Sequence, residues 1–110
     1  MGRIGFAYAI AALALAATGS VLAQSPIDNA SSGLRVATTI CAKCHQVTLT
    51  MSPSAVGAPS FAEIASRPTT TAISLKRFLR SNNHSRMPNF MLSPANTDDV
   101  VAYILSVKPN

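Results

Sequence analysis

Both cysteines of the chain lie in one short stretch, "TTICAKCHQV" (residues 38–47). Two residues separate Cys41 from Cys44, and His45 follows directly. Thiols and an imidazole at this spacing could serve three chemistries: a disulfide, a metal site, or covalent attachment of haem. The remaining sequence is needed to choose between these three chemistries.

Two of these interpretations fit the chain poorly. A disulfide exchanger of the thioredoxin type would place the pair near a βαβ pattern, and no segment alternates like a strand. A structural zinc site needs four ligands. Cys41, Cys44, His45 and His84 would supply four, but Cys44 and His45 are neighbours and chelate one tetrahedral ion awkwardly.

Haem attachment accounts for both cysteines and for the histidine that follows them. Two thiols on one helical turn can each add to a vinyl group of haem, and the next residue then projects its imidazole at the iron. C-x-x-C-H is the signature of this c-type attachment. It is specific because it fixes three residues at set positions within a run of five.

The N-terminal segment predicts export. Arg3 is followed by the apolar stretch "IGFAYAIAALALAA", and Val21-Leu22-Ala23 resembles the small-x-small pattern cut by a signal peptidase. We therefore expect a cleaved signal peptide over 1–23, a single domain over 24–110, a periplasmic location and no stable membrane span after cleavage. The alternative is a retained membrane anchor, since residues 4–23 have about the length that spans a bilayer.

The chain after residue 23 is basic and has few residues suited to a large core. Eight basic side chains stand against four acidic ones, which favours acidic partners or anionic surfaces. Export argues against nucleic acid. Four aromatic residues and no tryptophan give little bulk, and so small a domain usually needs additional stabilisation. A haem would provide it.

The hydrophobic pattern predicts an all-α chain with long loops. Residues 24–33 have the composition of a polar entry segment, and Ser31 or Ser32 is expected to cap a helix leading to the cysteines. A short helix is expected over 61–66. Thr70 or Thr71 should cap the helix that follows, whose apolar side would carry Ile73, Leu75, Phe78 and Leu79. Ser93-Pro94 should begin the last helix.

Four stretches carry a family resemblance: "GLRVATTICAKCH" (33–45), "VGAPSF" (56–61), "SRMPNFMLS" (85–93) and "DDVVAYILSVK" (98–108). With them the chain resembles the small bacterial class I cytochromes c over nearly all of residues 24–110. The resemblance implies the cytochrome c fold, with three to five short helices and long loops wrapped around one covalently bound haem c. It also implies that Gly33 lets Tyr103 pack closely. Ala37 departs from the family, which usually has a larger side chain there.

The resemblance also implies the iron ligands. His45 would be one. The residues alone leave Met87, Met91 and His84 as candidates for the other, because Met51 is only six residues from His45. The resemblance assigns Met87, and Met91 is then expected in the core beside Phe90 and Leu92. The carbonyl of Pro59 is expected to accept the ring N–H of His45.

Ligation by histidine and methionine favours ferrous iron and leaves no open position. We therefore expect an electron carrier and not an enzyme. Its redox partner should dock through an acidic surface near Lys43 and Arg86. The protein would act as a monomer, or as an electron-accepting subunit of a periplasmic dehydrogenase or oxidase complex. A five-coordinate haem enzyme or gas sensor is the remaining alternative.

Overall fold

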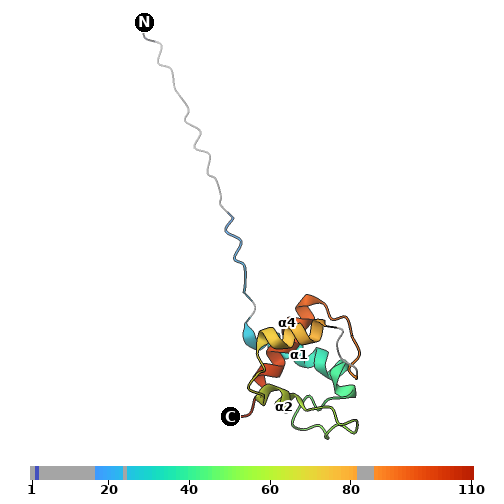
Figure 1. Ribbon diagram of the computed structural model, residues 1–110. Coiled ribbons are helices and arrows are strands. Elements are labelled where there is room, and N and C mark those ends of the chain that lie inside the picture. The colour runs from blue at the N-terminus through green and yellow to red at the C-terminus, as the bar shows by residue number, and fades with distance from the viewer. Residues whose placement is uncertain (1, 3–16, 24, 82–85) are drawn as a thin grey trace.

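The computed structural model describes residues 2, 17–23, 25–81 and 86–110, and it is helical without strands over these residues. The elements are α1 (Pro26–Thr39), the short 3-10 helix η1 (Cys41–Lys43), α2 (Phe61–Ser66), α3 (Ala72–Arg80) and α4 (Pro94–Ser106). In Figure 1 the two long loops around residues 46–60 and 86–93 extend from the end of the helical body where η1 lies. The all-α prediction is confirmed.

The first helix begins earlier than expected. It starts at Pro26, so Ser31 and Ser32 lie inside it and do not cap it. Proline suits the first helical position because its missing N–H would have no partner there. The Asn29 amide donates to the Ser25 carbonyl at 3.1 Å, and Asp28 places a negative charge in the first turn. These local signals start the helix at Pro26, although residues 24–33 have a polar composition.

The other helix starts agree with the sequence. The Ser60 hydroxyl accepts from the Glu63 amide while the Glu63 carboxylate accepts from the Ser60 amide, which closes a capping box at α2. Thr71, not Thr70, caps α3 in the same reciprocal way with Ser74. Ser93 caps α4 through the Asn96 amide, followed by Pro94.

The crossing of α1 and α4 forms the centre of the fold. Gly33 lies against the backbone of Asp99 and against Tyr103, and a Cβ added at Gly33 would come within 2.8 Å of the Tyr103 Cβ. Ala37, one turn further along α1, is fully buried. The close approach of Gly33 and Tyr103 is therefore present, and the small Ala37 side chain sits inside the crossing.

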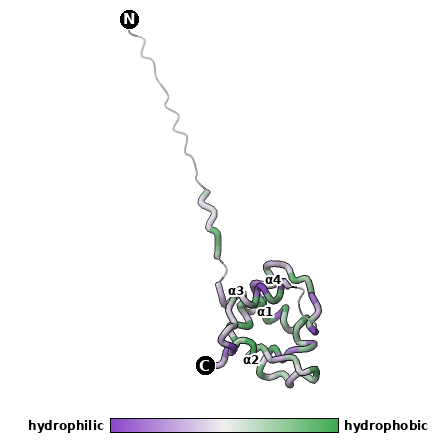
Figure 2. Tube along the Cα trace, viewed as in Figure 1, coloured by the Kyte–Doolittle hydropathy of each residue, from purple (hydrophilic) through white to green (hydrophobic). Residues whose placement is uncertain are grey.

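One face of α3 differs from expectation. Leu75 is buried and Leu79 packs against the core, but Ile73 is 71% exposed and Phe78 is 46% exposed. Ile73 precedes Leu75 by two residues, which rotates it by about 200° around the helix axis. The assignment of Ile73 to the buried side was wrong, since spacing of two residues places side chains on opposite faces of a helix. In Figure 2 each helix mixes hydrophobic and hydrophilic residues along its trace, as helices with one buried side do.

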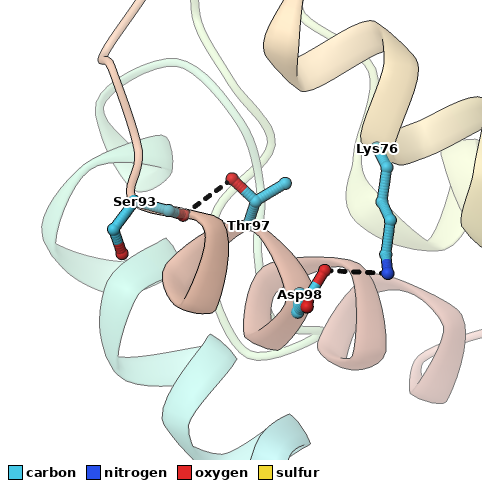
Figure 3. A network of polar contacts seen from close by, with 4 residues as sticks. All are labelled: Lys76, Ser93, Thr97 and Asp98. Carbon is cyan, nitrogen blue, oxygen red and sulfur yellow. Dashed lines mark hydrogen bonds and ion pairs between the residues drawn. The ribbon is translucent and has the colours of Figure 1, made fainter.

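One of two polar contacts near the start of α4 joins it to α3, and the other lies within α4 (Figure 3). The Lys76 ammonium lies 2.8 Å from an Asp98 carboxylate oxygen, and the buried Thr97 hydroxyl donates to the Ser93 carbonyl at 3.0 Å. Both members of the ion pair are about half exposed, so water screens their attraction and the pair adds little stability.

Within the part of the chain that the structure describes, no helix is long and apolar enough to cross a membrane. Residues 17–23 have no helical structure, and their Val21 and Leu22 side chains are exposed. Most of the predicted signal peptide lies outside the described residues.

Candidate haem site

The two cysteines occupy one tight turn at the end of α1. The amides of Cys44 and His45 both donate to the Cys41 carbonyl, at 3.1 and 2.9 Å, which winds residues 41–45 into a single turn. Cys41 is buried and Cys44 is exposed, and the two thiols do not form a disulfide. Burial raises the pKa of the Cys41 thiol. The turn thus places two free thiols and an imidazole within five residues, as haem attachment requires.

A hydrogen bond selects which ring nitrogen of His45 carries a proton when the ring is neutral. Its Nδ1 lies 2.7 Å from the Pro59 carbonyl oxygen. A carbonyl can only accept, so Nδ1 must carry the proton and donate it. In the neutral ring, Nε2 is then left with a free lone pair, which is the form that binds a metal. The expected contact between Pro59 and His45 is present in the structure.

A row of rings supports this histidine from the core. The ring centroid of Phe61 lies 5.6 Å from that of His45 and 6.1 Å from that of Tyr103. The Tyr103 hydroxyl donates to the Val47 carbonyl at 2.6 Å. The Phe61 amide also donates to the Gln46 carbonyl at 3.0 Å, which ties the start of α2 to the segment after His45.

The row formed by the rings of His45, Phe61 and Tyr103 was not predicted from the sequence. Phe61 stood within "VGAPSF", but its contact with His45 depends on how the intervening loop folds back. The bond from Tyr103 to Val47 joins positions 56 residues apart. Helical spacing reports local neighbours and carries no signal for either contact.

The segment 86–93 carries the methionine candidates. Met87 is half-buried, whereas Met91 is 85% exposed and is therefore not the core residue that was expected. Met91 has a φ of 49°, in the left-handed region, and its amide donates to the Asn89 side-chain oxygen at 2.9 Å. This tight turn explains the error, since it takes the Met91 side chain out of the core. Met51 packs against the core on the other loop. His84 lies outside the described residues.

The described residues give no support to the zinc interpretation. No three histidine, cysteine or acidic side chains among them form a group that could hold a metal ion. The fourth zinc candidate, His84, is not described. The donor set fits haem instead, because two thiols are available for thioether bonds and His45 Nε2 is available for the iron.

Comparison with known proteins agrees with this donor set. The cytochrome c family model matches residues 30–108. Cytochrome c-552 of Bradyrhizobium diazoefficiens is 37% identical over 81 residues, which cover 74% of this chain and 77% of that protein. No solved structure gives a significant match.

The chain belongs to the cytochrome c family. It is a small class I c-type cytochrome with the all-α cytochrome c fold, and its cofactor is covalently bound haem c with iron. The family transfers electrons between redox partners. The protein is accordingly a haem c electron-transport protein.

Proposed function

We propose that the protein is an exported, periplasmic electron carrier in which His45 and Met87 are the axial ligands of the haem iron. Cys41 and Cys44 would form the two thioether bonds. The haem supplies a one-electron couple between ferrous and ferric iron. The protein side chains fix its position and set its potential.

One observation supports this proposal most strongly: the 2.7 Å hydrogen bond from His45 Nδ1 to the Pro59 carbonyl. It selects the tautomer with a free Nε2 and holds the ring in one orientation. Partners of this kind orient metal-bound histidines and raise their basicity. Pro59 therefore has a role beyond ending the loop.

Met87 is proposed as the second ligand because of its place in the chain. It is half-buried and is followed by Pro88, which restricts the backbone next to the sulfur. Met91 is strongly exposed, which disfavours it as the rival. A thioether is a soft, neutral donor that favours ferrous iron and raises the potential. With both axial positions filled, no position remains for a substrate, so we propose a carrier and not an enzyme.

We also propose that residues 1–23 are an export signal and that residues 24–110 form the cytochrome domain. The apolar stretch and the Val21-Leu22-Ala23 pattern support this division. Mass spectrometry of the protein purified from the periplasm should give an N-terminus at Gln24. A chain retaining residues 1–23 in the membrane fraction would show that the segment is an anchor.

The ligand assignment is tested by comparing Met87→Ala with Met91→Ala in the haem-loaded protein. Ferric iron bound by methionine sulfur has a weak near-infrared absorption band. We expect Met87→Ala to lose this band, to lower the reduction potential and to bind carbon monoxide at neutral pH. Met91→Ala, the matched control, should keep the band.

Two outcomes would contradict the assignment. Loss of the band in Met91→Ala alone would make Met91 the ligand. Carbon monoxide binding by the unchanged protein would indicate an open iron position and favour the enzyme or gas-sensor alternative.

A further inference from the structure

The outer face of α3 has an unusual composition for a solvent-exposed surface. Ile73, Arg77 and Arg80 are spaced four and three residues apart, and at 3.6 residues per turn they fall within an arc of about 60°. Their side chains are all exposed. Leu75 and Leu79, which pack into or against the core, lie on the opposite side of the helix. We call Ile73, Arg77 and Arg80 the α3 face.

The charges of the α3 face are not compensated within the described chain. The only ion pair among the described residues joins Lys76 to Asp98. All four acidic residues of the chain are described, and none of them lies on α3. Arg77 and Arg80 therefore present two guanidinium groups beside an isoleucine that is 71% exposed.

The position of α3 leaves this face open. Among the described helices, α3 comes close only to α4, and it does not approach η1, which carries the cysteines. A partner could therefore contact the α3 face without covering the cysteine turn. Lys43, within that turn, is a separate exposed charge.

We propose that the α3 face is a second docking surface, for an acidic protein surface that also offers an apolar contact. Arginine binds carboxylates through paired hydrogen bonds, and protein interfaces are enriched in arginine around apolar anchors. A single isoleucine offers little area for insertion into a lipid surface, which favours a protein partner. Such a surface would hold the cytochrome on a partner while electrons pass at the haem edge. It does not depend on which methionine binds the iron.

The experiment measures binding of a dye-labelled synthetic peptide of Glu-Glu-Leu repeats to the haem-loaded protein by fluorescence anisotropy at low salt. The double variant Arg77→Gln/Arg80→Gln should weaken binding about tenfold. The control Arg35→Gln/Lys108→Gln removes the same charge elsewhere and should change it by less than about twofold. Ile73→Ser should remove the preference for this peptide over a Glu-Glu-Ser repeat. Unchanged haem spectra in every variant would show that the fold is intact.

Backbone amide shifts of the ¹⁵N-labelled protein locate the bound peptide. Shifts concentrated on residues 72–80 support the proposal. Shifts concentrated around Lys43 and Arg86, or equal weakening by the control pair, would overturn it. Binding to phosphatidylglycerol vesicles that is tighter than peptide binding and lost in Arg77→Gln/Arg80→Gln would show that the face recognises anionic lipid, which also overturns it.

Discussion

The Tyr103 hydroxyl connects the last helix to the segment that follows the cysteine turn. It donates to the Val47 carbonyl at 2.6 Å, and both residues are buried. Burial raises the pKa of Tyr103 above its ordinary value. The bond requires the proton, so ionisation of the phenol in the folded protein would cost both the bond and the solvation of the charge.

Tyr103→Phe should therefore reduce stability in a pH-dependent way. Near neutral pH we expect a loss of about 1–2 kcal/mol, because the buried Val47 carbonyl loses its donor. The folded pKa is raised, so the contribution of Tyr103 is complete below the unfolded value of about 10 and is lost as the pH rises through the folded pKa. The difference in unfolding free energy between wild type and variant should thus shrink in alkali, as measured by guanidinium denaturation of the haem-loaded protein.

A suitable control removes a hydrogen bond that cannot titrate. The Ser106 hydroxyl donates to the Tyr103 carbonyl at 2.6 Å. Ser106→Ala should change stability by the same amount at neutral and alkaline pH. If the effect of Tyr103→Phe were equally constant, the hydroxyl would not be coupled to stability in the way the structure indicates.

The packing of α1 on α4 leaves no room for a side chain at Gly33. A Cβ at this position would overlap the Asp99 carbonyl and press on Tyr103. Backbone cannot give way as a flexible side chain can, so the two helices would have to separate. The ring row from Tyr103 to His45 depends on this approach.

Gly33→Ala should destabilise the protein by about 2 kcal/mol or more, since overpacking forces the backbone to shift. Gly57→Ala is the comparison: its Cβ would meet nothing within 4 Å, but its φ of 72° is left-handed. We expect a cost there of about 1 kcal/mol. Denaturation midpoints of both variants test the order, and an equal or smaller loss at Gly33 would contradict the helix-crossing argument.

The elements show which parts of the fold could be predicted from sequence. The starts at residues 72 and 94 followed from local capping chemistry, which depends on a few adjacent residues, whereas the Ser60 cap of the short helix at 61 was not predicted. The start of α1 was missed because Pro26 and Asp28 were taken with the polar segment around them. Ile73 was assigned to the buried side of α3 because it is hydrophobic, although its angular position on the helix places it on the exposed side.

The candidate site also has one part that could be predicted from the sequence and one part that could not. The cysteine turn is a contiguous motif, so its residues could be named from sequence, and the family relationship supports the haem that they would hold. The contact of Phe61 with His45 and the exposure of Met91 depend on the path of two loops. Loop paths arise from tertiary contacts, and local spacing does not encode them.

At the scale of the whole molecule, positive charges outnumber negative charges. After residue 23, eight basic residues stand against four acidic ones, and one acidic side chain is paired with Lys76. Lys43, within the haem-attachment turn, and Arg86, directly before the proposed ligand Met87, are both exposed. A basic carrier of this kind should be drawn to an acidic partner before contact.

Added salt should therefore slow electron transfer to the partner. Attraction between exposed charges is screened over ~8 Å at physiological ionic strength, so steered association weakens steeply as salt rises. We expect Lys43→Glu or Arg86→Glu to lower the second-order rate more than Lys108→Glu, because Lys43 lies between the two attachment cysteines and Arg86 adjoins Met87, whereas Lys108 is near the chain end. Stopped-flow rates across a salt series measure this directly. A rate that does not change with salt would mean that docking is apolar, and a larger effect at Lys108 would place the docking contact on another face.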